Sequence, residues 1–393
     1  MLGFSCRHYI INLKNFYFII LDLKKAIVSV INDLVTDQRV NKTCNALLES
    51  GFEVLLVGRI KKDSMPLPNR NYRMHRMKLM FEKGPLFYAE FNLRLFLFLF
   101  FHKVDLLFSN DLDTLMPNFL ISKLKSKPII YDSHEYFTET PELVNRKFVQ
   151  GIWKKIEAWI FPKLKDVITV NTSIANLFKK DYGVDVAVVR NIPPNRPMAE
   201  NLAKPNIAVS QDKPIILLQG SGINIQRGAE ELVEAMQFVE VAHLLIIGGG
   251  DVIDDLKKMT TALKLDEKIT FLPKMPFEEL SFYTKQASLG LTLDKDTNIN
   301  YRFSLPNKLF DYIHAGVPVL ASPLLEIKKI IDDYKVGETI SNHLPGEIAK
   351  HITTIINNKE KLAEYKSNCK IAAKKLNWEF EKQNLINIIK KYA

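Results

Sequence analysis

The sequence predicts an α/β protein built from two tandem Rossmann-like, doubly wound domains with a cleft between them. The chain has 393 residues, more than one hydrophobic core usually holds, so two domains are expected. Short, unbroken apolar segments alternate with amphipathic ones, which is typical of parallel strands covered by helices on both faces. A stretch rich in proline and polar residues, 191–213, interrupts this alternation and is interpreted as the linker.

The first domain is predicted at residues 25–190, on the acceptor side of the cleft. It opens with the apolar segment AIVSVIND (26–33), followed by an amphipathic segment that ends at Gly51 and by a second strand, FEVLLVGR. The same unit recurs, and the later strands are predicted at VDLLFSND (104–111), KPIIYDSHE (127–135), DVITVNTS (166–173) and VAVVRNIPP (186–194).

Residues 1–24 are interpreted as an N-terminal extension whose order the sequence does not define. The apolar run Phe16–Leu23 is far shorter than the roughly 20 residues that a membrane-spanning helix needs, and it contains Asp22. A signal peptide is the alternative, but no small-residue cleavage site precedes Lys24.

The second domain is predicted at residues 214–376 and is expected to bind a nucleotide-sugar. The segment 377–393 is amphipathic and is predicted to form a closing helix on a domain surface. The strands of this domain are predicted at PIILLQGSG (214–222), HLLIIGGG (243–250), KITFLPKM (268–275), ASLGLTLD (287–294) and GVPVLASP (316–323).

Composition narrows the class of protein. The three cysteines are far apart and show no CxxC spacing, so the sequence suggests neither a disulfide framework nor a zinc site and favours the reducing cytosol. The net charge of +10 attracts anions, whether nucleic acid, anionic lipid or phosphorylated substrate. No recognised nucleic-acid-binding module is present, so a nucleic-acid partner is not expected.

Two glycine-rich turns follow apolar strands in the second domain, GSGINIQRG (220–228) and LIIGGGD (245–251). Glycine lets backbone amides approach a diphosphate at a helix N-terminus, and Arg227 can neutralise phosphate charge. An ordinary strand-to-helix turn with an exposed arginine is the alternative. Neither turn matches a nicotinamide-binding fingerprint or a P-loop. The glycines assigned to the donor site are Gly220, Gly222, Gly228, Gly249 and Gly250.

The segment SLPNKLFDYIHAGVPVLAS (304–322) is the most specific of the chain. Helical spacing places Lys308 and Asp311 on one face of a helix that ends at Gly316. A lysine facing phosphates and a carboxylate accepting hydroxyl hydrogen bonds suit a sugar nucleotide, and Asn307 is assigned to the same site. An exposed ion pair is the alternative.

With these motifs, the chain from Lys25 onward resembles the group 1 glycosyltransferases, a retaining family with the GT-B architecture. The resemblance implies that Asp311, in LFDYIHAGVPVL, binds the donor ribose and that Arg227 takes the place of a phosphate-binding lysine. Two positions depart from the family pattern. Ile223 stands where an arginine is usual, and Phe303 stands at the first acid of the E-x7-E pair.

In the first domain, the same resemblance places His134, in YDSHEYFTE, near the reacting sugar, so His134, Arg227 and Lys308 are the predicted catalytic residues. Polar residues at strand ends are assigned to the acceptor side, although a capping role for one of them, Asp37, is the alternative. Clustered acids can indicate a metal, but a DxD set on a donor loop is missing and the resemblance implies metal-independent transfer. The acceptor-side residues are Asp33, Asp37, Arg39, Asp111 and Glu135.

The aromatic stretch 88–103 follows a basic stretch at 61–83. It is interpreted either as a buried core helix or as a segment that inserts partly into an anionic membrane surface, where lipid-linked acceptors reside. The expected location is the cytoplasm, with a peripheral position on the inner face of the cytoplasmic membrane under the second interpretation.

The predicted function is transfer of a sugar from a nucleoside-diphosphate-sugar to the hydroxyl of a saccharide or lipid-linked acceptor. Retention and a role in cell-surface polysaccharide or glycolipid assembly follow from the resemblance. No cofactor is expected besides the sugar nucleotide as co-substrate. The alternatives are a sugar-nucleotide epimerase of the same architecture and a non-catalytic lipid- or nucleic-acid-binding protein.

Overall fold

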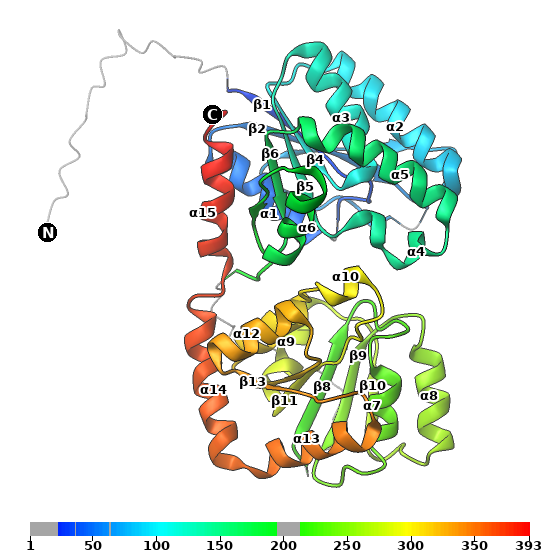
Figure 1. The fold of residues 1–393 in the computed structure, drawn as a ribbon, viewed down its shortest axis with the longest axis vertical. Coiled ribbons are helices and arrows are strands. Elements are labelled where there is room, and N and C mark those ends of the chain that lie inside the picture. The colour runs from blue at the N-terminus through cyan, green and yellow to red at the C-terminus, as the bar shows by residue number, and fades with distance from the viewer. Residues whose placement is uncertain (1–22, 36, 63, 195–212) are drawn as a thin grey trace, which may run out of the picture.

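The structure, a computed structural model, describes residues 23–35, 37–62, 64–194 and 213–393. Two parallel sheets, each flanked by helices, lie one above the other along the long axis of the molecule (Figure 1). The strand orders are β3-β2-β1-β4-β5-β6-β7 and β10-β9-β8-β11-β12-β13. In each sheet the order reverses beside the first strand, which is the doubly wound arrangement. The predicted fold class is therefore confirmed.

The first sheet and its helices form the N-terminal domain. The strands are β1 (Lys25–Ser29), β2 (Glu53–Ile60), β3 (Arg73–Lys78), β4 (Leu106–Asn110), β5 (Ile129–Ser133), β6 (Asp166–Thr169) and β7 (Ala187–Val188). The helices are α1 (Gln38–Glu49), α2 (Gly84–Phe101), α3 (Leu112–Lys125), α4 (Pro141–Val144), α5 (Lys147–Ile160) and α6 (Thr172–Tyr182), with short 3-10 turns η1 (Phe137–Glu139) and η2 (Phe161–Lys163).

The second sheet and its helices form the C-terminal domain. The strands are β8 (Ile215–Gly220), β9 (His243–Gly248), β10 (Ile269–Leu272), β11 (Leu289–Thr292), β12 (Val319–Ala321) and β13 (Gly337–Thr339). The helices of this domain are α7 (Ala229–Ala235), α8 (Ile253–Ala262), α9 (Phe277–Gln286), α10 (Ile299–Arg302), α11 (Asn307–Ala315), α12 (Leu325–Tyr334), α13 (Pro345–Asn357) and α14 (Lys359–Ala373). The last helix of the chain is α15 (Trp378–Ile389).

Burial explains why these apolar segments form central parallel strands. Every residue of β4, β5 and β11 is buried, as expected for strands covered on both faces. The β1–β4 and β4–β5 pairs are parallel, so the carboxyl ends of these strands lie at one edge of the sheet. The same holds for β8, β11 and β12 in the second sheet. These two edges carry most of the residues predicted for the site.

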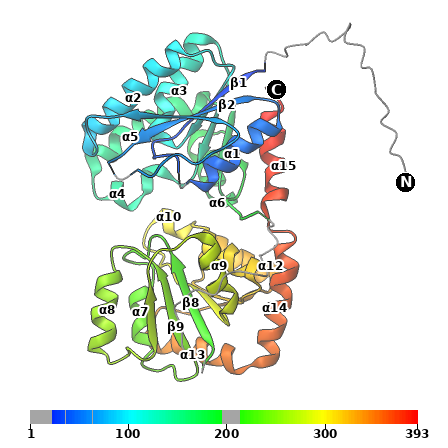
Figure 2. The same ribbon diagram turned by 180° about the vertical axis from the view of Figure 1, so that it is seen from behind.

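The closing helix α15 packs on the N-terminal domain, although it follows the last helix of the C-terminal domain. Leu385 and Ile389 belong to the same buried cluster as Val40 and Leu47 of α1. Both views show α15 beside the upper sheet, with the chain crossing back between the domains just before it (Figures 1 and 2). The C-terminal segment therefore joins the two domains a second time.

Two of the predicted segments lie largely outside the described residues. The N-terminal extension was assigned to residues 1–24, of which the structure describes 23 and 24. The linker was assigned to residues 191–213, of which the structure describes 191–194 and 213. The domain boundaries stay predictions.

Helix α2 combines features of both interpretations of the aromatic stretch. Phe87, Phe91 and Leu95 are buried in the core of the N-terminal domain, whereas Leu93 and Phe101 on the opposite side are exposed. Among the described helices, α2 is the one long and apolar enough to cross a membrane by length and composition, and 28% of it is buried. One face of α2 is thus core, and the other presents apolar side chains to solvent.

Candidate functional site

The two glycine-rich turns at the carboxyl edge of the second sheet pack directly against each other. The backbone N–H of Ile223 donates to the carbonyl of Gly249 at 2.8 Å. A Cβ atom added to Gly250 would lie 2.0 Å from the carbonyl oxygen of Ile223, and one added to Gly228 would lie 2.2 Å from that of Leu293. Protein packing therefore requires glycine at positions 228 and 250.

The remaining glycines have a different environment. An added Cβ at Gly220 or Gly222 would make only ordinary contacts, whereas one at Gly249 would meet the flexible end of Lys274. A side chain at position 220 or 222 would thus meet no steric obstacle, although the Gly220 carbonyl itself accepts a hydrogen bond from the backbone N–H of Gly249 at 3.2 Å. The side chain of Ile223 is buried in the domain core, which explains why this turn carries no charge at the position where the family has arginine.

The two predicted phosphate-binding cations converge on one buried carboxylate, Asp294, just beyond the end of β11. Arg227 Nη1 donates to Asp294 Oδ1 at 3.0 Å, and Lys308 Nζ lies 3.5 Å from Asp294 Oδ2. Burial alone would raise the pKa of Asp294, but Lys308 and Arg227 lower it below its ordinary value. The cluster therefore keeps one net positive charge, which a diphosphate can neutralise.

Contacts within the protein hold Arg227 in place but leave part of its hydrogen-bonding capacity unused. Its guanidinium carbon lies 4.9 Å above the ring centroid of Tyr301, a cation–π contact. Among the described residues, its Nε atom is buried without a hydrogen-bond partner. Asp294 is not among the residues predicted from the sequence, although an acid at the carboxyl end of a buried strand is a usable signal.

Asp311 lies on α11 and faces the end of β8. Gln219 Nε2 donates to Asp311 Oδ2 at 3.2 Å, while Thr284 Oγ1 donates to Gln219 Oε1 and so fixes the amide orientation. Burial raises the pKa of Asp311 to about 7. Hydrogen bonds from ligand hydroxyl groups would favour its ionised form, as expected for a ribose-binding residue. Asn307 is exposed at the first turn of the same helix.

In the N-terminal domain, His134 follows β5 and lies between two carboxylates. Its Nδ1 is 3.1 Å from Asp111 Oδ2, and its Nε2 is 3.5 Å from Asp132 Oδ2. The backbone N–H of His134 also donates to Asp111 Oδ1 at 2.9 Å. Burial alone would lower the pKa of His134, but the two carboxylates raise it well above its ordinary value. The imidazole is therefore a cation at neutral pH.

Asp132, which is also not among the predicted residues, forms a buried ion pair with Arg39. Arg39 Nε and Nη2 donate to the two carboxylate oxygens at 2.9 and 2.6 Å, and Nη1 donates to the carbonyl of Val189. Burial alone would raise the pKa of Asp132, but Arg39 and His134 hold it at about 2. The assignment of Arg39 to acceptor contacts is thus corrected, because its guanidinium group is buried and engaged within the protein.

Asp37 also receives a correction. Its carboxylate caps α1 by accepting from the backbone N–H of Val40 at 3.0 Å, and it accepts a second hydrogen bond from Asn32. The capping alternative therefore describes Asp37. The carboxylate of Asp33 accepts from the backbone N–H of Val35, which stabilises the turn after β1.

Asp111 combines an unusual backbone with contacts to His134. Its φ angle of 58° lies in the left-handed region, which non-glycine residues rarely adopt. Burial and the charge of Asp111 raise the pKa of the neighbouring Asp113 well above its ordinary value. Among the described residues, Asp113 Oδ1 is buried without a hydrogen-bond partner. The protonated form of Asp113 is therefore favoured by its surroundings.

The domains touch through short segments at the facing edges of the sheets. Asn300 Nδ2 of α10 donates to Glu135 Oε2 at 2.8 Å. Asn171 Nδ2 donates to the carbonyl of Phe303 at 2.7 Å, and the backbone N–H of Ser173 donates to Glu326 Oε1. The structure thus brings the residue after His134 against the C-terminal domain, whereas the acids after β1 stay in their own turn.

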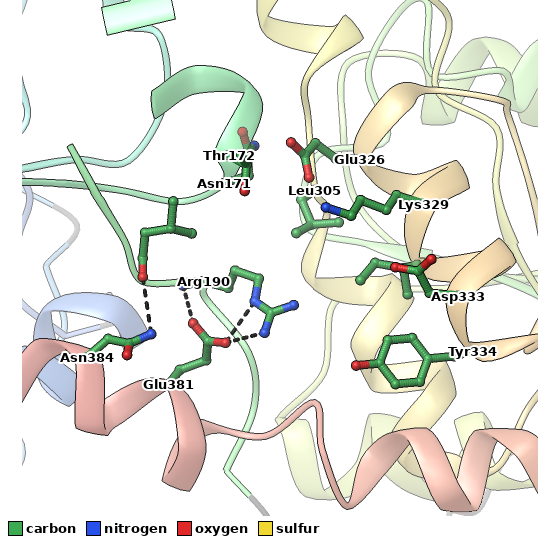
Figure 3. A pocket seen from close by; sticks show the side chains of 12 residues that line it. Asn171, Thr172, Arg190, Leu305, Glu326, Lys329, Asp333, Tyr334, Glu381 and Asn384 are labelled. Atoms are coloured by element: carbon green, nitrogen blue, oxygen red, sulfur yellow. Dashed lines mark hydrogen bonds and ion pairs between the residues drawn. The ribbon is translucent and has the colours of Figure 1, made fainter. Parts of the chain in front are cut away.

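A cavity of about 260 Å³ lies between the domains near the crossing of the chain (Figure 3). Arg190 and Glu381 are paired on its N-terminal side, and Lys329, Asp333 and Tyr334 of α12 line the other side. Its lining includes none of the predicted site residues. Residues of α15, α12 and the last strand of the first sheet line this cavity, so it lies apart from the predicted site.

The described residues contain no group of three or more His, Cys, Asp or Glu side chains arranged to hold a metal ion. The charge at the donor edge instead comes from Arg227, Lys308 and the N-terminus of α11. A diphosphate can be held there by cations and backbone amides.

Comparisons with known proteins agree with this arrangement. A model of the group 1 glycosyl transferases matches residues 201–375, and one of glycosyltransferase family 4 matches residues 38–194. No curated protein matches the sequence.

Solved structures share the fold over nearly the whole chain. Sucrose-phosphate synthase from Thermosynechococcus elongatus is 15% identical with a TM-score of 0.72, covering 94% of this chain and 98% of that chain. WaaG, a glycosyltransferase involved in lipopolysaccharide biosynthesis, is 14% identical with a TM-score of 0.70, covering 93% and 99%. Anabaena HepE in complex with UDP and glucose is 13% identical with a TM-score of 0.68, covering 94% and 100%.

Proposed function

This chain belongs to the group 1 glycosyltransferases, and on that premise we propose that it moves a sugar from a nucleoside-diphosphate-sugar to an acceptor hydroxyl group. The observation that carries the proposal is the convergence of Arg227 and Lys308 on Asp294, next to the glycine-rich turn 220–228. A diphosphate leaving group gathers negative charge as the glycosidic bond breaks. Preorganised cations that stabilise this charge supply much of such catalysis.

The N-terminal domain supplies a second charged group. His134 is an imidazolium whose Nε2 contacts to Asn110 Oδ1 and Asp132 Oδ2 are long, at 3.3 and 3.5 Å. Such contacts can be exchanged for a hydrogen bond to the donor sugar or its phosphate. We propose that His134 binds the transferred sugar in this way, with Asp111 and Asp132 holding the ring in place.

Transfer with retention of the anomeric configuration is part of the proposal. Its support is the family membership, together with the engagement of Asp111, Asp132 and Glu135 with partners inside the protein. Metal-independent transfer is proposed on the same basis, together with the cationic diphosphate site. The transfer rate should therefore be unchanged by excess EDTA.

The donor in the test is chosen from the complexes of similar proteins, several of which contain UDP or UDP-glucose. Purified protein would be incubated with UDP-, GDP- and ADP-sugars and a panel of saccharide and lipid-linked acceptors, and the products followed by NMR spectroscopy. An α-linked product from an α-linked donor supports retaining transfer. Release of a free epimerised sugar without acceptor would instead establish the epimerase alternative.

We further propose that the acceptor is lipid-linked and that the N-terminal domain docks on the inner face of the cytoplasmic membrane. The outer helices α2 and α5, in contact through Tyr88 and Trp153, both expose apolar side chains. Basic side chains lie on the same helical layer, among them Lys123 and Lys154. The exposed apolar residues are Leu86, Leu93, Leu97, Phe100 and Phe101 on α2, and Phe148, Ile152 and Trp159 on α5.

Such a surface fits an anionic bilayer, because apolar side chains enter the headgroup region while basic ones attract acidic lipids. Co-sedimentation with vesicles containing phosphatidylglycerol tests this proposal. Phe101→Glu should weaken binding, whereas Phe238→Glu, which changes a comparably exposed phenylalanine of the C-terminal domain, should not. Equal binding by both variants would exclude docking through α2. A role in cell-surface polysaccharide or glycolipid assembly would then lose its main structural support.

A further inference from the structure

The segment 299–303 is covalently part of the C-terminal domain but packs on the N-terminal domain. The side chains of Ile299 and Phe303 lie against the buried cluster that contains Tyr136 and Phe178. In Figure 1, α10 is the element of the lower domain that reaches up toward the upper one. Phe303 therefore serves as an interdomain packing residue at the position where the family has the first acid of its pair.

Asn300 lies at the centre of this contact. Its amide Nδ2 donates to Glu135 Oε2 at 2.8 Å, and its Oδ1 accepts from the backbone N–H of Tyr136 at 3.4 Å. Both polar atoms of one side chain thus engage the two residues that follow His134. Neither alanine nor aspartate can make both interactions, because the first has no polar atoms and the second has no amide donor.

The next residue in the same turn reaches the donor edge. The Tyr301 ring lies under the guanidinium group of Arg227, at 4.9 Å, and its backbone N–H donates to Asn298 at 2.9 Å. Tyr301 is buried. Two consecutive residues of one short helix therefore contact the proposed phosphate-binding arginine and the loop that carries His134.

We propose that Asn300 is a positioning residue for sugar transfer, which sets the His134 loop relative to the donor held by Arg227. The inference rests on the proposed function for its catalytic consequence, but its structural content is independent. When the domains meet, Asn300 fixes the loop through Glu135 and Tyr136, and Tyr301 fixes the same turn to Arg227. A misplacement of about 1 Å at a reacting centre can reduce a rate by about 100-fold.

The test compares Asn300→Ala and Asn300→Asp with Arg302→Ala. Arg302 lies on the same helix but is exposed and pairs with Asp296, so its loss disturbs α10 without touching the His134 loop. Hydrogen–deuterium exchange of the segment 133–137 and steady-state kinetics with UDP-glucose, or with whichever nucleotide-sugar the wild-type protein uses, are measured for each protein. Thermal unfolding checks that each variant is folded.

For both Asn300 variants, the proposal expects faster exchange in 133–137 and a kcat reduced by about 10- to 100-fold, with the donor KM changed less than about threefold. Arg302→Ala should resemble the wild type in both measurements. Unchanged exchange in the Asn300 variants, or an equal effect of Arg302→Ala, would overturn the positioning role. If the wild-type protein cleaves no nucleotide-sugar, the proposed function fails, while the exchange comparison still decides whether Asn300 holds the loop.

Discussion

The two domains each place an arginine beside a buried aspartate, but the two pairs differ in what remains for a ligand. Arg39 is buried and makes three hydrogen bonds within the protein, so its pair with Asp132 is closed. Arg227 has a partly exposed side chain, and Asp294 is shared with Lys308, which leaves an excess of positive charge. An arginine–aspartate pair is thus fully engaged within the protein in the first domain, whereas in the second it leaves positive charge that we propose binds a ligand.

The largest loss of stability is expected when Arg39 is removed. Arg39→Ala leaves Asp132 buried with His134 as its remaining cation, and the loss of one partner from a buried pair costs about 3–5 kcal/mol of unfolding free energy. Urea denaturation measures this loss. Arg73→Ala is the matched control, because Arg73 pairs with Glu53 at the surface and its loss should cost less than about 1 kcal/mol. A small effect of Arg39→Ala would show that its pair is not structural.

The second change tests the other arginine. Arg227→Ala should reduce kcat by about 100- to 1,000-fold, in the range observed when one group that stabilises developing charge is removed. Its unfolding free energy should fall less than that of Arg39→Ala, because the Arg227 side chain is partly exposed and Lys308 still neutralises Asp294. Lys268→Ala, at a surface pair with Glu240 in the same domain, is the control for activity. An inactive but strongly destabilised Arg227 variant would erase the contrast with Arg39.

A third prediction concerns a buried acid outside both pairs. Burial raises the pKa of Glu157 from its ordinary value of 4.5 to about 7. The folded state therefore binds a proton that the unfolded state has released, so stability falls as pH rises from about 4.5 to 7. Since one pKa unit is worth about 1.4 kcal/mol, the loss is roughly 3 kcal/mol.

Glu157→Gln removes this titration while keeping an acceptor for the Tyr182 hydroxyl group. The difference in unfolding free energy between the variant and the wild type should grow across this pH range in favour of the variant. Parallel pH profiles for the two proteins would show that Glu157 does not titrate in this window. The comparison thus tests a buried acid that has no cationic partner among the two arginine–aspartate pairs.

The smallest expected effects distinguish structural from ligand-facing glycines. Gly250→Ala should cost about 1–3 kcal/mol of stability, because its Cβ would press on the carbonyl oxygen of Ile223. Gly222→Ala meets no such obstacle and should leave stability within about 1 kcal/mol, while weakening nucleotide binding. Thermal unfolding with and without UDP compares them. A stable Gly250 variant would show that the turn can adjust.

The contrast between the domains also explains what the sequence could predict. The residues proposed to bind the donor could be picked out from the sequence, because Arg227, Lys308 and Asp311 lie in two local strand–turn–helix motifs. Asp294 lies in neither motif. It follows β11, and the parallel pairing of β11 with β8 brings it close to the turn that carries Arg227.

The N-terminal half-site was less predictable, because its partners come from distant segments. Arg39 and Asp132 are separated by 93 residues, and their hydrogen bonds depend on how α1 packs over β5. The acids after the first strand were assigned to an acceptor, but Asp37 caps a helix and Asp33 stabilises a turn. A polar side chain at a strand end indicates a ligand site only when nearby backbone groups do not already use its hydrogen-bonding atoms.

The alternation of unbroken apolar segments with amphipathic ones predicted both doubly wound sheets, because fully buried strands must be apolar along their whole length. It did not predict that α15 returns to the N-terminal domain. Amphipathicity shows that a helix covers an apolar surface, but both domains offer such a surface. The contacts of Leu385 and Ile389 with the α1 cluster decide between them.

The most direct test of the account is equilibrium binding of UDP, GDP and ADP, measured by thermal shift and calorimetry on the wild type, Arg227→Ala and Lys308→Ala. A nucleotide at 100 times its Kd should stabilise the wild type by about 2.7 kcal/mol. The account predicts that one of the three binds, and that both variants lose most of this stabilisation while remaining folded. Binding that is unchanged in both variants, or no binding of any nucleotide, would contradict a donor site at Arg227, Lys308 and Asp294.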